Sequence, residues 1–424
     1  QTVTEGQLVR ASASRIRVYA DQPDCAMLRQ DGTYQLDGML MPSDYGSMPI
    51  WLTDVDDIRM IRAPNAVFRL VDVMQRSFFI QTGRLSDQGK VLVPGLTLGI
   101  LGQDYVPTED STDGSGIDAT YAGRLEDDFR KSGILHLMAV SGGHLAVVAT
   151  LVRTICAFFV IPRRITAILI GLSYIALSCC MFPSDSVFRA LLMGLAGATC
   201  LFVGRRGQAL STLCWTAMGV LLIQPYMSYS FGFALSCAAV LGIVLFADRM
   251  TDWLKAMLPL FVAQAAGMTI AAQLFTLPLQ VLIEPELPVF SILANLVVSP
   301  VVGFSTLAGL ASLALSWILP DIGFVLAWLS GCGTAIMEIV SLHLGSGNHA
   351  TIPWAGGIPG AMLVLAVESV CACSVWLMRR IARRAGTPEQ GMPGRRMLSN
   401  PMDRLRLWGT LTFAALKNMH WDAG

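Results

Sequence analysis

The chain has 424 residues, of which 54% are hydrophobic and 14% are charged, with a mean hydropathy of +0.56. Because soluble proteins carry roughly 25% charged residues, this composition excludes an ordinary soluble domain and predicts a polytopic α-helical membrane protein. The 30 basic and 30 acidic residues cancel, and every cysteine except Cys25 lies in an apolar segment, which argues against an intrachain disulfide framework. We expect no metal and no cofactor.

Residues 1–90 are polar and contain short alternating runs such as 33–40 and 58–62, separated by turn residues. This pattern predicts a small OB-like β domain, followed by a helix from about Val71. Exposed cations and aromatic side chains would suit nucleic acid there, because cations follow phosphates and bases stack on rings. The candidates are Tyr34, Trp51, Arg59, Arg62 and Arg69. A generic β domain with a solvated charged face is the open alternative.

Residues 91–132 are expected to connect this domain to the membrane. The apolar stretch 91–101 is too short to span a bilayer, so we expect it to be interfacial or re-entrant. From Asp104 to Asp128 the carboxylates are scattered among Ser, Gly and Pro, which predicts a mobile acidic linker. The spacing of these carboxylates matches no calcium-binding loop.

Residues 133–378 form the expected transmembrane domain. The apolar runs predict about nine spans, at 134–160, 165–182, 187–203, 208–223, 231–247, 257–283, 289–318, 322–344 and 359–378. The seventh, 289–318, carries Asn295, Pro300 and Gly303, so we expect a kinked or broken helix that lines a cavity. Two carboxylates, Glu338 and Glu368, lie inside the eighth and ninth spans.

Loop charges predict the topology. Arginine pairs follow the first, third and ninth spans, and alternate loops are neutral or acidic, which places the basic loops in the cytoplasm. The N-terminal domain is then external and the basic tail, residues 379–424, is cytoplasmic and attracted to anionic lipid. The chain starts at Gln1 without a signal peptide, so we expect a fragment or a processed product.

A polar stretch opens the first predicted span. His136, Ser141, Gly142, Gly143 and His144 lie where a membrane helix should begin. Polar groups in a span are costly, so this stretch is either a working site or a close contact between helices. Both interpretations stay open.

Six ordered motifs resemble the ComEC-type competence proteins. They cover about residues 90–355: Leu92–Gly99, Phe129–Gly133, the signature His136–His144, Phe188–Met193, Pro225 with Phe231–Gly242, and Ala272–Pro278 with Asn295–Pro300. The resemblance implies that the N-terminal spans and the C-terminal metallo-β-lactamase-like domain of the family are missing here. We therefore expect no enzymatic activity from this chain.

The resemblance also implies a function. A ComEC-type protein is an inner-membrane channel that imports transforming DNA as a single strand during natural competence. The expected partners are single-stranded DNA, the lipid bilayer, a competence DNA receptor and a cytoplasmic ATPase, and a homo-oligomer is an open alternative. The residues expected along the pore or DNA path are His136, Ser141, Gly142, Gly143, His144, Arg189, Asn295 and Pro300.

Two other functions are alternatives. One is an intramembrane serine hydrolase that uses Ser141, with a base supplied by His144, His343 or His349. The stretch around Ser141 lacks the first glycine of a nucleophile elbow, which speaks against it. The other is a small-solute transporter, but no internal repeat is visible.

Overall fold

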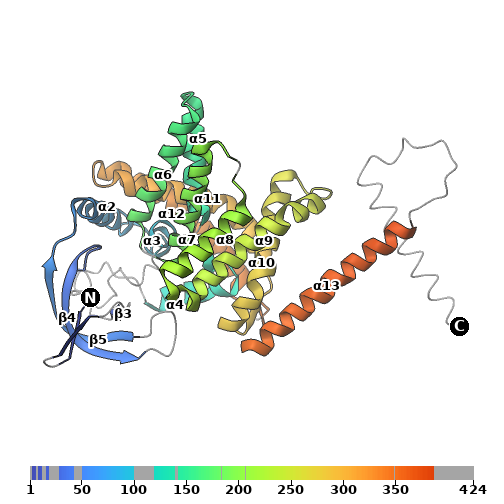
Figure 1. Ribbon diagram of the computed structural model, residues 1–424, viewed down its shortest axis with the longest axis horizontal. Coiled ribbons are helices and arrows are strands. Elements are labelled where there is room, and N and C mark those ends of the chain that lie inside the picture. The colour runs from blue at the N-terminus through green and yellow to red at the C-terminus, as the bar shows by residue number, and fades with distance from the viewer. Residues whose placement is uncertain are drawn as a thin grey trace. The chain divides into compact units, whose positions relative to one another are not determined.

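The computed structural model describes residues 2–5, 8–11, 16–18, 28–42, 50–99, 119–138, 142–182, 184–205, 207–347 and 349–385. Its architecture is mostly helical, with short strands near the N-terminus (Figure 1). The chain divides into two compact units, residues 1–241 with 287–352 and residues 242–286 with 353–424. Each unit is described by itself.

The N-terminal strands form two small sheets. β1 (Thr2–Glu5) and β2 (Leu8–Ala11) make an antiparallel pair. β3 (Ile16–Val18), β4 (Thr33–Pro42) and β5 (Ile50–Arg62) form a second sheet in the order β3–β5–β4, with β3 parallel to β5. The described strands therefore include no closed five-stranded barrel, and the predicted OB-like fold remains a prediction.

Two helices follow the strands and pack among the other helices. α2 (Ala66–Thr82) starts at Asn65, whose side chain accepts a hydrogen bond from the Phe68 amide at 3.0 Å. α3 (Asp87–Leu98) ends at Gly99, which has the left-handed backbone (φ 79°) that glycine adopts without strain. Both pack against α11 and α12. The apolar stretch predicted to be interfacial is thus the second half of α3, and its side chains are buried in protein.

The remaining helices and strands follow in chain order: α4 (Ala119–Lys131), η2 (Leu135–Leu137), α5 (Gly142–Phe158), α6 (Arg163–Cys180), α7 (Asp185–Val203), α8 (Ala209–Ile223), η3 (Pro225–Tyr229), α9 (Phe231–Leu254), α10 (Leu260–Ile283), β6 (Glu286–Pro288), α11 (Ser291–Leu315), α12 (Pro320–Gly345), β7 (Thr351–Pro353) and α13 (Gly357–Ala385). Within the described residues, seven helices are long and apolar enough to cross a membrane. α5 and α8 are apolar but shorter, so the predicted number of nine spans is not established.

Three predictions from the sequence are wrong. The first span starts at Gly142, not at residue 134, because a turn at Gly133 (φ 74°) and the short η2 precede it. α11 is one continuous helix through Pro300 and is not broken. The acidic linker is helical from Ala119, where an amphipathic helix packs on α12. The apolar segment of the last span, Gly357–Met378, ends where the sequence predicts, and its helix continues to Ala385.

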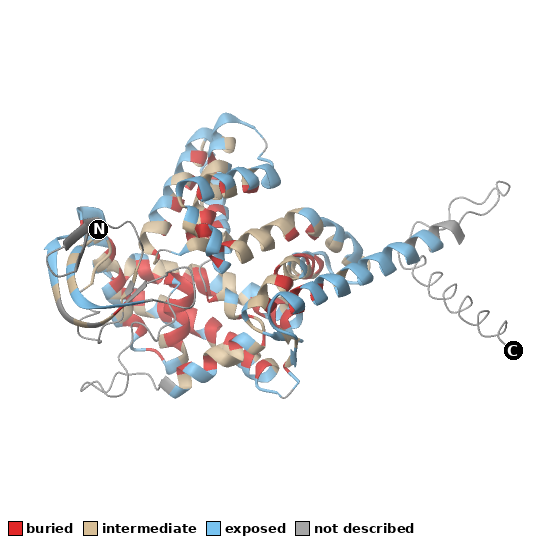
Figure 2. Ribbon diagram, turned by 60° about the horizontal axis from the view of Figure 1, so that its bottom comes forward, coloured by how far each residue is buried: buried red, intermediate tan, exposed pale blue. Residues whose placement is uncertain are grey.

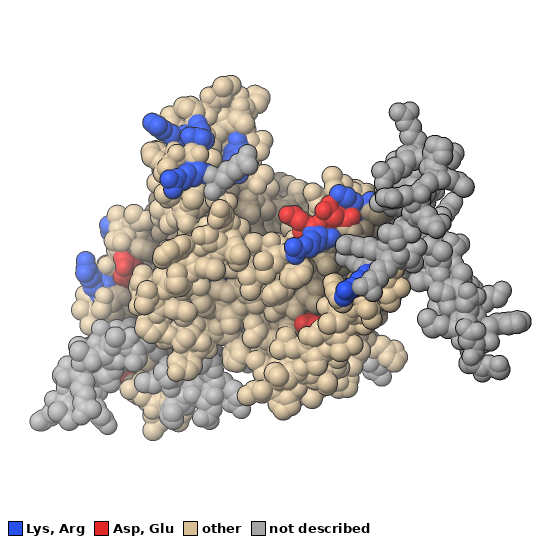
Figure 3. Space-filling model, turned by 45° about the vertical axis from the view of Figure 1, so that its right-hand side comes forward, with Lys and Arg blue, Asp and Glu red and all other residues tan. Residues whose placement is uncertain are grey.

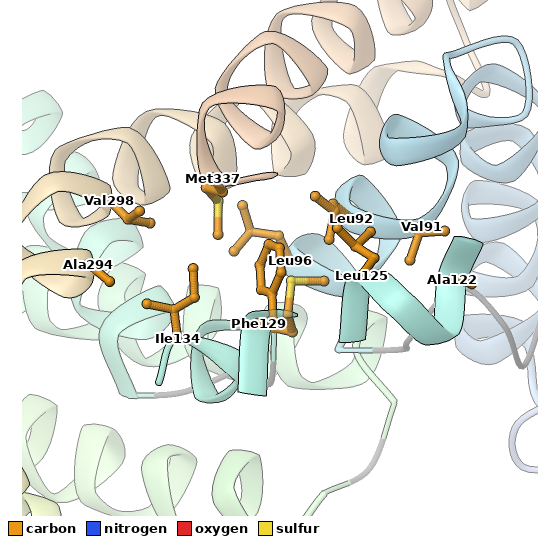
Figure 4. Packing of buried hydrophobic residues seen from close by; sticks show 11 residues of the cluster. Val91, Leu92, Leu96, Ala122, Leu125, Phe129, Ile134, Ala294, Val298 and Met337 are labelled. Atoms are coloured by element: carbon orange, nitrogen blue, oxygen red, sulfur yellow. The ribbon is translucent and has the colours of Figure 1, made fainter. Parts of the chain in front are cut away.

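The largest cluster of buried hydrophobic residues joins α3, α4, α11 and α12 (Figure 4). It contains Val91, Leu92, Leu96, Ala122, Leu125, Phe129, Ile134, Met138, Ala294, Val298 and Met337. Phe129 lies near its centre and is 1% exposed. Burying a side chain of this size stabilises a fold by about 1.5–3 kcal/mol, which explains why the amphipathic α4 is ordered against the long helices.

Hydroxyl side chains packed against glycine recur between the helices. A Cβ added to Gly309 would overlap Thr97 Oγ1, one added to Gly333 would overlap Ser305 Oγ, and one added to Gly323 would overlap the side chain of Ser316. Small residues let helix backbones approach closely where lipid provides no hydrophobic driving force. Contacts between Cα–H groups and oxygen add weakly to such packing.

Candidate functional site

The N-terminal ends of α7 and α9 are joined by a shared hydroxyl. Ser230 donates a hydrogen bond to Asp185 at the start of α7 and accepts one from the Phe233 amide (3.1 Å) at the start of α9. Ser184 caps α7 by accepting from the Val187 amide at 3.3 Å. These caps satisfy amide groups that would otherwise be unpaired at the helix ends.

Arg189 lies one turn into α7 and is buried, with 3% of its surface exposed. Its Nε donates to Ser236 Oγ on α9 at 2.8 Å, and its Nη1 contacts Met193 Sδ at 3.1 Å. None of the ion pairs found among the described residues includes Arg189. The acid one turn earlier, Asp185, accepts from Ser230 instead. The structure therefore contains a buried guanidinium whose neighbours in the described chain are neutral.

The signature stretch approaches this arginine. A Cβ on Gly142, the first residue of α5, would stand 4.0 Å from Arg189 Nη2 and 3.9 Å from the Ala190 side chain. His144 is buried on α5, Gly143 is exposed, and His136 is exposed on η2, so the two histidines lie on different elements. Ser141 falls outside the described residues, and the pairing that a serine hydrolase needs stays an untested prediction.

Asn295 holds the turn before the signature against α11. Its Nδ2 donates to the Ser291 carbonyl at 2.8 Å and lies 3.4 Å from the Gly133 carbonyl. A Cβ on Gly133 would come within 2.6 Å of Ser291 Oγ, so the left-handed glycine is also needed for this close approach. Asn295 is 4% exposed, whereas Pro300 is exposed farther along α11. Both of the contacts at Asn295 are internal, and neither involves Arg189.

The carboxylates inside the spans have different surroundings. Glu338 on α12 accepts a hydrogen bond from the Tyr121 hydroxyl on α4. Burial, and then the contact with Glu338, raises the pKa of Tyr121 above its ordinary value, so the phenol stays protonated. Glu368 is half-buried on α13, one turn beyond the buried Val364.

The candidate residues of the N-terminal part do not lie on one surface. Tyr34 pairs with Met60, and Gln35 pairs with Arg59. Because neighbouring strand residues point to opposite faces, Tyr34 and Arg59 lie on opposite faces of the sheet.

The remaining candidates are divided among a strand and a helix. The Arg62 side chain is exposed at the end of β5. Arg69 belongs to α2 and not to the sheet. The side chain of Trp51 lies outside the described residues. Tyr34 and Arg59 therefore do not share one face of the sheet, and the contact of these five residues with DNA stays a prediction.

Sequence reasoning placed Arg189, Gly142 and Asn295 among the candidates but missed their partners. Ser236 and Met193 lie within recognised motifs, yet only the fold brings them to Arg189. Ser230 had one available signal, since it stands just before an apolar helix, where serine acts as a cap, whereas Ser291 is the first residue of α11 and does not cap it. Nothing in the sequence indicated which helix each would contact.

The long apolar helices and their buried polar contacts define a multi-pass helical membrane protein. The model of the Competence protein family matches residues 116–380, well over half of the chain. The chain belongs to this family.

One curated relative is ComE operon protein 3 of Bacillus subtilis (strain 168). It is 27% identical to the chain over 184 residues, which are 43% of this chain and 23% of that protein. The chain thus covers less than a quarter of the relative's length. No solved structure matches the chain.

Proposed function

We propose that this chain forms membrane-spanning parts of an inner-membrane channel that imports transforming DNA as a single strand. Membership of the Competence protein family supports a role in DNA uptake. The observation that supports a path for single-stranded DNA is the environment of Arg189. This buried cation has neutral neighbours and lies beside the first residue of the signature helix. Its partner in this proposal is a phosphate of the DNA backbone.

The energetics favour an anionic ligand at Arg189. Removing an ion from water costs several kcal/mol unless an opposite charge and hydrogen bonds compensate. A guanidinium has five N–H donors in a planar fork that matches phosphate oxygens, and Ser236 and Met193 engage only two of its nitrogen atoms. A phosphate that reaches this position gains charge-assisted hydrogen bonds, so binding is favoured.

The sequence around this arginine is poor in acids. Between Gly142 and Ile223 the chain has six arginines, and its single acidic residue is Asp185. A polyanion that passes these helices would therefore meet little repulsion from them. Many of the acidic residues instead lie between Asp104 and Asp128, outside this segment.

The topology of the proposal follows from loop charge and helix length. α5 and α8 have 17 and 15 residues, which give about 25 and 22 Å at 1.5 Å per residue, close to the hydrocarbon core of a bilayer. With both counted, nine spans place the N-terminal region outside and the basic tail in the cytoplasm. In this proposal the external N-terminal region is an OB-like domain that contacts DNA.

The proposed partners are a competence DNA receptor outside and an ATPase inside. The proposal assigns no catalytic step, including degradation of the strand that is not imported, to residues 1–424. Ser141 then serves to pack or to line the path.

The test is uptake of end-labelled duplex DNA in the source cells, measured as label protected from external nuclease. Arg189→Gln keeps the size of the side chain but removes its charge, and we expect protected label to fall at least about tenfold, the equivalent of 1.4 kcal/mol. Arg189→Lys keeps the positive charge but lacks the planar, forked set of N–H donors, so this variant should retain part of the uptake. Surface-bound label should not change in either variant.

The matched control is Arg153→Gln, which removes an exposed arginine from α5 and should leave uptake unchanged. Protein levels in the membrane are compared by immunoblot for all variants. If Arg189→Gln accumulates normally and imports DNA at the wild-type rate, Arg189 does not contact the transported strand.

A further inference from the structure

Three exposed arginines gather where α6 begins and α7 ends. Arg163 and Arg164 are the first two residues of α6, and Arg205 follows the last turn of α7. The Arg163 guanidinium lies over Gly204, the left-handed residue (φ 85°) that ends α7, with Cζ 3.0 Å from the position of an added Cβ. This contact holds the Arg163 side chain across the two helix ends, near the partial negative charge of the α7 C-terminus.

No acidic side chain compensates these arginines within the two helices. The only acid of the segment, Asp185, lies 20 residues before Arg205, about 30 Å away along α7. This separation is several times the Debye length of about 8 Å at physiological salt. On the face shown in Figure 3, one group of basic side chains has no acidic side chain among the described residues beside it. The local positive potential therefore has to attract an external anion.

Large apolar side chains are presented at the turn between α5 and α6. Phe158, Phe159 and Val160 are 81%, 66% and 87% exposed, and the two rings meet edge to face at 5.2 Å. Val160 has a left-handed backbone (φ 53°), which is rare for a β-branched residue. Strain of this kind persists at positions with a function, and here the turn points three apolar side chains outward.

We propose that Phe158–Val160 together with Arg163, Arg164 and Arg205, here named the arginine–aromatic surface, bind the anionic phospholipids of one bilayer leaflet. Apolar side chains enter the boundary between headgroups and acyl chains, while neighbouring arginines meet the phosphates. The exposed apolar face continues from the turn along α6 through Ile165, Ile168 and Leu172. That continuity fits a lipid surface.

DNA fits this surface less well. Arg205 lies 16 residues from Arg189, about 24 Å along α7, so the two arginines do not contact the same phosphate. The apolar strip beside the arginines is mostly aliphatic along α6, and aliphatic side chains give bases no stacking surface. Lipid is therefore the occupant that uses every part of the surface.

The experiment compares the full chain in nanodiscs of phosphatidylcholine with nanodiscs that contain phosphatidylglycerol. The readouts are the thermal unfolding midpoint and the number of phosphatidylglycerol molecules retained in native mass spectrometry. We expect phosphatidylglycerol to raise the midpoint of the wild type. In the triple variant Arg163→Gln, Arg164→Gln and Arg205→Gln the preference for this lipid should fall, roughly fivefold for each charge removed.

Two controls accompany the triple variant. Arg249→Gln with Lys255→Gln removes two exposed cations of the other compact unit, outside the basic tail, and should keep the retained lipid unchanged. Replacing the same three arginines by lysine keeps the charge and should restore binding, which also shows that the fold survives changes at these positions.

Two results would overturn the proposal. One is equal retention of phosphatidylglycerol in the wild type and the triple glutamine variant. The other is displacement of the lipid by a single-stranded oligodeoxynucleotide that needs the same three arginines, which would make the surface a DNA site. Inorganic phosphate at millimolar concentration should not reproduce the stabilisation, because it lacks the acyl chains.

Discussion

α12 and α13 are both long apolar helices, of 26 and 29 residues, yet the protein buries them to very different degrees. In their most apolar segments, 39% of the residues of α12 are buried, against 11% for α13 (Figure 2). The buried face of α12 is rich in small and hydroxyl residues, such as Gly323, Ser330 and Gly333. Among the residues of α13 whose burial is described, only Gly360, Ala361 and Val364 are buried, and the branched and aromatic side chains are largely exposed.

This comparison shows that hydropathy alone does not distinguish a helix that is packed within the protein from one whose side chains are mostly exposed. Both sequences are apolar enough to span a bilayer. What differs is the number of positions where another backbone or a hydroxyl approaches closely. The following variants test this interpretation.

The largest effect is expected from truncating matched methionines. Met337 on α12 is fully buried in the cluster with Phe129 and Leu96, and Met337→Ala should cost about 2–5 kcal/mol because it leaves a cavity. Met362 on α13 is 62% exposed, and Met362→Ala should cost far less. Unfolding midpoints in the same detergent measure both. If the two variants lose equal stability, the difference in burial between α12 and α13 has no energetic consequence.

The next effect concerns the glycines. Gly333→Ala places a Cβ onto Ser305 Oγ and 3.1 Å from Val301, so we expect a loss of about 1–3 kcal/mol from overpacking. Gly303→Ala on α11 is the control, because a Cβ there meets nothing within 4 Å. Replacing a helical glycine by alanine in free space gains about 0.5–1 kcal/mol, so the two substitutions should have opposite signs. Thermal unfolding of the two variants side by side decides this.

A smaller effect is expected at Gln88, which attaches α3 to α12. Its Nε2 donates to the Gly331 carbonyl at 3.1 Å, and its Oε1 accepts from Thr334 Oγ1 at 2.9 Å. Gln88→Ala should cost about 0.5–1.5 kcal/mol. A double-mutant cycle with Thr334→Val isolates the shared hydrogen bond. Strictly additive losses would mean that the two side chains do not interact.

The smallest effect is a pH dependence at Asp128 on α4, whose carbonyl lies against Gly345 of α12. Burial, and then repulsion by Asp127, raises the pKa of Asp128 above its ordinary value. A raised carboxylate pKa means that the protonated form stabilises the fold in acid, and that this contribution is lost as the pH rises through the raised pKa. Asp128→Asn should therefore raise the unfolding midpoint slightly at pH 7.5 and leave it unchanged at pH 4. A lower midpoint at pH 7.5 would contradict this sign.

The apolar runs predicted the helices well, because a membrane helix needs a long uninterrupted apolar segment and little else. Each predicted span corresponds to a helix, and the errors lie at the ends. The residues just after Gly133 are apolar and are therefore predicted to begin a span, but the left-handed turn at Gly133 and the contacts of Asn295 precede a short 3-10 turn at Leu135–Leu137. Such a turn depends on a partner 160 residues away, which no local pattern reveals.

The candidate site was predicted in part. The motifs singled out Gly142 and Arg189, and the fold brings these two together. Sequence could not decide whether Arg189 reaches the membrane surface or lies buried, because that depends on Ser236 of another helix. It likewise grouped Tyr34 with Arg59, since strand pairing and register were unknown before the sheet was seen.

The contacts between α7 and α9 have a mechanical consequence. Ser230 with Asp185 and Ser236 with Arg189 join the same two helices at points about 6 Å apart along α7 and about 9 Å apart along α9. One such contact alone would let the helices pivot around it. Two contacts oppose that rotation and also sliding, so we expect the first turns of α7 and α9 to move together and any widening of the space beside Arg189 to come from the α5 side.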